Sequence, residues 1–257
     1  MTKKILINLS LLSIIGVTVY FAYFYDHENK KSATEMSKGI EDVSWFGEEE
    51  PVKQGDPDFV RSIRLDVPLE SQLEGIALEN GCEITSLSML LQYYGYEVNK
   101  NQLAKELDYV PYTLNQTTYG NPNVGFVGDI KKGKKAMGVH VDPIAKVARK
   151  IVKDDFEVVA SQGRSFQDIL NKLQEDTPVW ILSTISMQIP TEDDFIPWKT
   201  KEGTLQVTPL IHSVVLTGMD GNNVYYNDPY GFKDASIPTE DLKEVYNKMG
   251  KQSLYLK

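Results

Sequence analysis

The feature that most constrains the fold is a pair of apolar runs in the last third of the chain, joined by a turn signal. The runs are His212–Met219 (H-S-V-V-L-T-G-M) and Val224–Asn227 (V-Y-Y-N), and the residues between them are D-G-N-N. β-branched and aromatic residues on both sides of an Asp-Gly turn predict a β-hairpin. A mostly apolar run at 178–185 and a short run at 253–256 have the composition of further strands. We therefore expect an antiparallel sheet in the C-terminal part of the chain.

Helical patterns dominate the part of the chain before this sheet. Between Cys82 and Tyr94, apolar residues recur at three- and four-residue steps, and Gly95 provides a stop signal. Asn99 can cap a second helix that runs to Leu107. Further expectations are helices at 165–175 and 239–249, strands at 64–68, 139–144 and 157–160, and a long loop at 108–138. Helices followed by an antiparallel sheet indicate an α+β fold.

The N-terminal segment predicts a membrane span. Lys3 and Lys4 precede positions 5–25, where no charged residue and no proline occur. As a helix this run would be roughly 30 Å long, about one hydrocarbon core, and it lacks the small-residue cleavage site of a signal peptide. A buried core helix is the alternative for this run. We expect a signal-anchor transmembrane helix at 1–25, a polar acidic linker at 26–63, and one domain at 64–257 outside the cytoplasm, secreted if the anchor is cleaved.

Charge and cysteine content exclude several classes of function. The chain has 27 Lys and Arg against 36 Asp and Glu, a formal net charge of −9, which argues against binding to a nucleic-acid backbone. One cysteine cannot form an intrachain disulfide, and the sequence has no zinc-type Cys/His cluster and no phosphate-binding glycine loop. We expect no metal, no organic cofactor and no nucleic-acid partner. The sequence does not indicate an oligomeric state.

The single cysteine, Cys82, follows Gly81 at the start of the first expected helix. Gly81 would let the backbone turn tightly into this helix. The positive end of the helix dipole and the unpaired N–H groups there favour a thiolate, which is the form that a nucleophile needs. The alternative is a small buried hydrophobic residue, the commonest fate of a free cysteine. Position alone leaves both interpretations open.

A nucleophilic cysteine needs a base, and the chain offers three histidines. His27 lies in the expected linker, so we set it aside. His140 alternates with valines, which favours a structural role in a strand. His212 begins the apolar hairpin and is the remaining candidate for the base.

Asp228, at the end of the hairpin, is the candidate for orienting His212. If Met219 pairs with Val224, Asp228 lies opposite Val215, roughly 10 Å along the strand from His212. Contact between the two then requires sheet twist or a bulge. An acidic residue in that place could orient the imidazole and stabilise its cation. The alternative is a turn-forming aspartate before a proline.

Together these stretches resemble the bacteriocin-processing cysteine peptidases, cysteine peptidase family thirty-nine, and especially their stand-alone relatives. The resemblance covers about residues 64–257. It implies a papain-like fold, with N-terminal helices packed on the C-terminal antiparallel sheet. The stretches that carry it are V-P-L-E-S-Q (67–72), G-C-E-I-T-S-L-S-M-L-L-Q-Y-Y-G (81–95), H-S-V-V-L-T-G-M-D-G (212–221) and Y-Y-N-D-P-Y-G (225–231).

The resemblance implies a role for each of four residues. Cys82 is the nucleophile, His212 the general base and acid, and Asp228 the residue that orients His212. Gln72 donates to the oxyanion beside a backbone N–H at the helix start, although a surface glutamine in a loop is the alternative there. The implied reaction is hydrolysis of a peptide or amide bond through a thioester acyl-enzyme, without metal or cofactor.

The substrate is not indicated by the sequence. Exporter-linked members of that family cut double-glycine leaders in the cytoplasm, whereas this chain has no nucleotide-binding motif and its domain is expected outside. An extracellular protein or peptide, or a cell-wall crosslink, is the expected partner of the site. The alternative functions are an NlpC-type cell-wall endopeptidase or acyl transferase, a membrane-tethered binding module on the same fold, and a structural surface protein with an inert cysteine.

Overall fold

The computed structural model describes residues 61–131 and 135–257. The expected transmembrane segment at 1–25 and nearly all of the expected linker lie outside these ranges, so both stay predictions. Within the described ranges, no helix is long and apolar enough to cross a bilayer.

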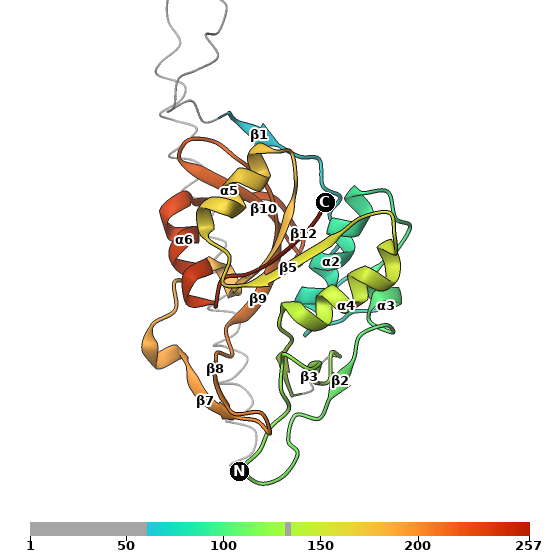
Figure 1. The fold of residues 1–257 in the computed structure, drawn as a ribbon, viewed down its shortest axis with the longest axis vertical. Coiled ribbons are helices and arrows are strands. Elements are labelled where there is room, and N and C mark those ends of the chain that lie inside the picture. Colours follow the sequence, from blue (N-terminus) through green and yellow to red (C-terminus); the bar gives the residue numbers. More distant parts are fainter. Residues whose placement is uncertain (1–60, 132–134) are drawn as a thin grey trace, which may run out of the picture. The chain divides into compact units, whose positions relative to one another are not determined.

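An antiparallel sheet forms the centre of the described part of the chain (Figure 1). Its strands are β1 (Ile63–Arg64), β5 (Val158–Gln162), β6 (Val179–Thr184), β9 (Ile211–Met219), β10 (Asn223–Asp228), β11 (Phe232–Pro238) and β12 (Gln252–Leu256). They pair in the order β11, β10, β9, β6, β12 and β5, and β1 also pairs with β9. Every one of these pairings is antiparallel. The expected hairpin is confirmed as β9 and β10, with Met219 opposite Val224.

Helices cover both faces of this sheet. α2 (Cys82–Tyr93) and α4 (Val141–Val152) pack on one face, and α5 (Phe166–Gln174) and α6 (Thr239–Lys248) pack on the other (Figure 1). The mixed α and β architecture with an antiparallel sheet is therefore as expected. The helices expected at 165–175 and 239–249 are confirmed as α5 and α6.

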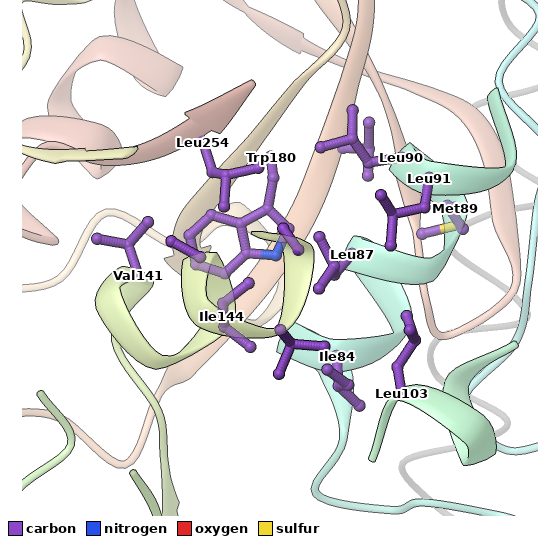
Figure 2. Packing of buried hydrophobic residues seen from close by; sticks show 14 of the residues in the cluster. Ile84, Leu87, Met89, Leu90, Leu91, Leu103, Val141, Ile144, Trp180 and Leu254 are labelled. Carbon is purple, nitrogen blue, oxygen red and sulfur yellow. The ribbon is translucent and has the colours of Figure 1, made fainter. Parts of the chain in front are cut away.

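The central strand β6 begins with four apolar residues, at 179–182, and contacts on both of its faces explain them. Its side chains alternate between the two cores, so that Trp180 contributes to the core under α2 and α4, while Val179 and Ile181 contribute to the other. Figure 2 shows the Trp180 indole between Leu87 of α2 and Ile144 of α4. Helices cover both faces of this strand, so apolar side chains are favoured on both sides. Ser183 departs from this pattern, because its hydroxyl is buried with no partner among the described residues.

Gly81 and Gly95 flank the helix α2 and allow the backbone to enter it tightly and to turn after its end. It stops one residue earlier than expected, and Gly95 follows with a left-handed φ of +86°. Residues 82–91 are all buried, so the helix runs through the core. Gly81 has an ordinary φ of −107°. A Cβ there would lie 2.6 Å from the Cβ of Leu78, so the tight entry into α2 depends on the missing side chain.

The expected strand at 139–144 is wrong, because α4 begins at Val141. Pro143 lies in the first turn of this helix, where a proline lacks no hydrogen bond that the helix needs. Ile144 and Val147 then continue at helical spacing on the buried face. The alternation of valines around His140 extends over too few residues to define a strand.

The expected long loop at 108–138 contains a small sheet. Its strands are β2 (Tyr109–Val110), β3 (Phe126–Gly128) and β4 (Ala136–Gly138). A separate hairpin, β7 (Ile196–Lys199) with β8 (Thr204–Val207), was not expected from the sequence. The two small sheets share a buried cluster formed by Val127, Met137, Trp198 and Val207. Strands of two to four residues are too short for a periodic sequence signal.

Two further elements are shorter in the structure than the sequence predicted. α3 (Lys100–Leu103) is capped by Asn99 as expected, but it ends before Leu107. The strand expected at 64–68 is reduced to β1.

Candidate active site

The start of α2, the first residues of β9 and the end of β10 meet at the candidate site. Ser86, one turn into α2, donates its hydroxyl to the main-chain carbonyl of Ser213 at 3.0 Å, which fixes the helix start close to His212. The exposed fractions of Cys82, His212 and Asp228 are 7%, 1% and 6%. The three residues predicted to form a triad are therefore all buried. Asp228 joins the other two, since it bonds His212 and interacts electrostatically with Cys82.

A β-bulge places Asp228 on the same face of the sheet as His212. Near the turn the register is as expected, but Tyr226 lies opposite Leu216, so that β9 carries one extra residue. Continuing this register puts Asp228 opposite Val214, two residues from His212 instead of three. Side chains two residues apart on a strand share a face. The bulge therefore converts an arrangement on opposite faces into a diagonal contact on one face.

His212 is held between two groups at the end of β10. Its Nε2 lies 2.9 Å from Oδ1 of Asp228, and a carboxylate can only accept, so Nε2 carries the proton in the neutral imidazole. The ring of Tyr230 stacks on the imidazole, with 4.8 Å between centroids, and the Tyr230 N–H donates to the same Oδ1 at 2.8 Å. Among the described residues, the buried Nδ1 of His212 has no partner. The imidazole is thus fixed with one free acceptor, as a general base requires.

The Cys82 thiol donates to Glu83. The distance from Sγ to Oε2 of Glu83 is 3.2 Å, and no hydrogen bond joins Sγ to His212 within the described ranges. Burial raises the pKa of the Cys82 thiol well above its ordinary value, and the neighbouring Glu83 carboxylate raises it further. Both effects oppose the thiolate that the helix start favours. A helix dipole contributes only about 0.3–1 kcal/mol, less than the lost hydration and the adjacent negative charge.

Glu83 is the site residue that sequence reasoning missed. Its exposed fraction is 1%, and Oε1 accepts a hydrogen bond from the main-chain N–H of Val139 at 3.0 Å. Burial raises the pKa of this carboxyl group. A Cβ at Gly138, at the end of β4, would lie 2.2 Å from Oε1, so the backbone passes directly over the carboxyl group. The available signal was an acidic residue in the first turn of an otherwise buried helix.

Gln72 lies beside the site, but its amide group is already engaged. Its main-chain N–H donates to the carbonyl of Pro229 at 2.7 Å, and Pro229 directly follows Asp228. Nε2 donates to the carbonyls of Leu78 at 3.3 Å and Glu79 at 2.8 Å. Oε1 is buried and has no partner among the described residues, and it can only accept. In this arrangement Gln72 offers no free donor to an oxyanion, and its predicted role stays a prediction.

Main-chain groups at the start of α2 are the remaining oxyanion donors. No side chain caps this helix start, and the first N–H groups of a helix have no partner within the helix. The N–H of Cys82 is one of these groups, so it can donate beside the sulfur atom.

His140 lies outside the candidate triad. Its Nδ1 is 2.8 Å from Oδ1 of Asn123, and burial lowers its pKa to about 4, so the ring is neutral at pH 7. This arrangement agrees with the structural role expected for it, at the start of α4 and not in a strand. His27 lies outside the described residues.

A cavity of about 220 Å³ adjoins the site. Ile211, which lines it, directly precedes His212, and Met137, which also lines it, directly precedes Gly138 at the Glu83 carboxyl group. None of Cys82, His212, Asp228 and Gln72 lines this cavity. It reaches the Glu83 side of the site, because Cδ1 of Ile211 would lie 3.3 Å from a Cβ at Gly138.

Within residues 61–131 and 135–257, no group of three or more His, Cys, Asp or Glu residues is placed to hold a metal ion. That the site works without a metal or cofactor stays a prediction.

Comparison with known proteins places the chain in a family. The model of the Peptidase_C39 like family matches residues 64–254. The uncharacterized protein YvpB of Bacillus subtilis (strain 168) is 38% identical over 192 residues, which are 75% of each chain. The crystal structure of a candidate C39-like peptidase from Bacillus anthracis superposes with a TM-score of 0.72 at 33% identity, covering 77% of this chain and 98% of that one. The chain belongs to the Peptidase_C39 like family.

Proposed function

We propose that this protein is a membrane-anchored, extracytoplasmic cysteine peptidase of papain-like fold, with Cys82, His212 and Asp228 as its catalytic triad. The observation that carries the proposal is the 2.9 Å contact between His212 and Asp228, which leaves Nδ1 free close to the start of α2. Membership of a peptidase-like family supports the reaction class. The uncharged run at 5–25 supports the membrane anchor.

The proposed reaction is acyl transfer to the Cys82 sulfur. As Sγ attacks the carbonyl carbon of the peptide bond, its proton moves to Nδ1 of His212, and the Cys82 N–H holds the oxyanion. The imidazolium, stabilised by Asp228, then protonates the leaving amine. His212 next removes a proton from water, whose oxygen attacks the thioester carbon. The C–S bond breaks, the carboxylic acid is released, and His212 returns the proton to the Cys82 sulfur.

The proposed substrate is a peptide or protein outside the cytoplasm. The cavity beside Ile211 and Met137 gives room for one of its side chains. Because the domain is proposed to lie outside, a cell-wall peptide is a further substrate of the same chemistry.

The test is hydrolysis of a peptide library by the full-length protein in mild detergent, with products identified by mass spectrometry. We expect cleaved peptides from the wild type and none from Cys82→Ala or His212→Ala, since loss of either residue removes about 10⁴-fold or more of the rate. The variants must keep the thermal melting point of the wild type. A wild type that cleaves neither library peptides nor peptidoglycan stem peptides would overturn the proposal.

One observation favours a second function, a peptide-binding module without turnover. The Cys82 sulfur is nearly covered, and its thiol is bonded to Glu83 instead of His212. Peptide binding that is equal in the wild type and Cys82→Ala, with no product from either, would establish this alternative.

A further inference from the structure

The carboxyl group of Glu83 is too specifically placed for a residue that only fills space. It is buried next to the thiol, and each of its oxygens accepts one hydrogen bond, Oε2 from Cys82 and Oε1 from Val139. The carbonyl of Glu83 accepts a third, from the Trp180 indole N–H at 3.0 Å. The close approach of Gly138 prevents the carboxyl group from moving away from α2 in that direction.

The surroundings of this pair hold one base and two acidic groups. His212 faces it from β9, Asp228 from the end of β10, and Tyr230 from the turn after β10, and each of them interacts electrostatically with Cys82 or Glu83. The thiol therefore has two acceptors within its region, the Glu83 carboxylate and Nδ1 of His212. In this structure it uses Glu83, and Nδ1 has no partner.

We propose that Glu83 is a positioning residue that keeps Cys82 as a neutral, oriented thiol at rest, so that no thiolate–imidazolium pair forms before substrate binds. This inference rests on the proposed peptidase function for its role in a reaction, but not for its test. In the resting site the proton is then on the Cys82 sulfur and not on Nδ1 of His212.

The proposed step conserves every proton. When a substrate carbonyl reaches the site, the S–H bond breaks and an N–H bond forms at Nδ1 of His212, while the sulfur electron pair forms the bond to carbon. Glu83 loses the thiol hydrogen bond and keeps that of Val139. Because burial and the Glu83 charge both oppose a resting thiolate, proton transfer accompanies attack and does not precede it.

Alkylation of Cys82 by iodoacetamide as a function of pH tests the proposal in the full-length protein. Cys82 is the only cysteine, so the incorporated label reports this thiol alone. In the wild type we expect a rate that rises only at alkaline pH, above the ordinary thiol range of about 8.5, with no plateau at low pH. In Glu83→Gln we expect the midpoint to move down by about one pH unit or more, because the amide removes the charge while its oxygen can still accept from Val139.

The control is Glu97→Gln, the same substitution at an exposed glutamate after α2, which should leave the alkylation curve unchanged. A low-pH plateau in the wild type would overturn the proposal. So would a folded Glu83→Gln variant, with the melting point of the wild type, whose curve superposes on that of the wild type.

A second measurement needs no variant and covers the case in which Glu83→Gln does not fold. The infrared S–H stretching band of the wild type belongs to Cys82 alone, and we expect it at neutral pH, shifted to the low frequency of a thiol bonded to a carboxylate. The absence of this band at neutral pH, or its occurrence at the frequency of a free thiol, would overturn the proposal.

These readouts separate this inference from the peptidase function. If the alkylation curve moves in Glu83→Gln but no peptide is ever cleaved, Glu83 controls the thiol and the peptidase function fails. If peptides are cleaved and the curve does not move, the peptidase function holds and the role of Glu83 fails.

Discussion

The two halves of the candidate site differ in how far they are assembled. In the base half, His212 and Asp228 are bonded to each other, and the free Nδ1 is the atom that catalysis needs. In the nucleophile half, Cys82 is bonded to Glu83 and the Gln72 amide is bonded to main-chain carbonyls. The base half has the contact that the proposed triad requires, whereas the thiol of the nucleophile half has no hydrogen bond to His212 within the described ranges.

The scaffold explains this difference. The base half lies on two adjacent strands of the central sheet, where the register and one bulge fix both side chains. The nucleophile half lies at a helix start and in the segment before it, where first-turn N–H groups have no partners in the helix. There the thiol and the Gln72 amide bond to neighbouring groups of the same segment. The sheet thus fixes His212 and Asp228 in place, whereas the proposed reaction requires the Cys82 thiol to change its hydrogen-bond partner from Glu83 to His212.

Asp228→Asn should produce the largest effect, because it breaks the base half. The amide can direct an N–H group at His212 and favour the wrong tautomer, so we expect kcat/KM for peptide cleavage to fall by about 10³–10⁴-fold. Asp234→Asn, the same substitution at an exposed position on β11, is the matched control and should leave kcat/KM unchanged. Loss of less than about ten-fold in Asp228→Asn would mean that the His212–Asp228 contact is structural.

Trp180→Ala should weaken the core that holds the nucleophile half. The indole is fully buried between the sheet, α2 and α4 (Figure 2), and its N–H donates to the main chain of Glu83. We expect the free energy of unfolding, measured by urea denaturation, to fall by about 3–5 kcal/mol. Trp198→Ala, in the smaller cluster between the two small sheets, should lower the free energy of unfolding by less than Trp180→Ala does. Equal losses of unfolding free energy in the two variants would contradict the view that the core behind α2 contributes more stability than the smaller cluster.

Much of this fold was predictable because its signals are local and periodic. The apolar spacing after Cys82, the Asp-Gly turn after Met219, and the cap at Asn99 each depend on residues close in the sequence. The order of Cys82, His212 and Asp228 along the chain allowed the three to be proposed together. The structure brings them into one region.

The remaining features depend on contacts between segments that no local pattern encodes. The bulge at Tyr226 changes which face Asp228 occupies, and one extra residue in a strand leaves no periodic trace. The pairing of Glu83 with Val139 joins α2 to the segment after β4, which was expected to be a strand. The pKa of the Cys82 thiol could not be predicted for the same reason, since burial and Glu83, which raise it, come from tertiary packing whereas the dipole comes from the helix alone.

Gly138→Ala should disturb the nucleophile half by pushing on the Glu83 carboxyl group. Gly138 has a φ of +80°, and its new Cβ would lie 2.2 Å from Oε1, so strain and a steric clash both apply. We expect a loss of about 1–3 kcal/mol in the free energy of unfolding and a changed pH curve for Cys82 alkylation. Gly95→Ala is the matched control, because Gly95 has a φ of +86° but nothing within 4 Å of the added Cβ. If both variants lose the same stability and neither changes alkylation, the contact with Glu83 is unimportant.

Gln72→Ala should have the smallest effect on catalysis and decides between two roles for this residue. Its Nε2 hydrogens bond two main-chain carbonyls, so we expect a loss of about 1–2 kcal/mol in the free energy of unfolding. Because the amide is engaged in these bonds, we expect kcat to fall by less than about ten-fold. Loss of a true oxyanion donor would lower kcat by about 10²–10³-fold. Gln92→Ala removes an amide on α2 that donates to Glu70, Ser88 and Val98, and it controls for lost stability alone. A fall of about 10²-fold or more in Gln72→Ala only would show that the amide leaves the carbonyls for the oxyanion during turnover. The nucleophile half would then rearrange at Gln72 as well as at Cys82, whereas the base half stays as the sheet holds it.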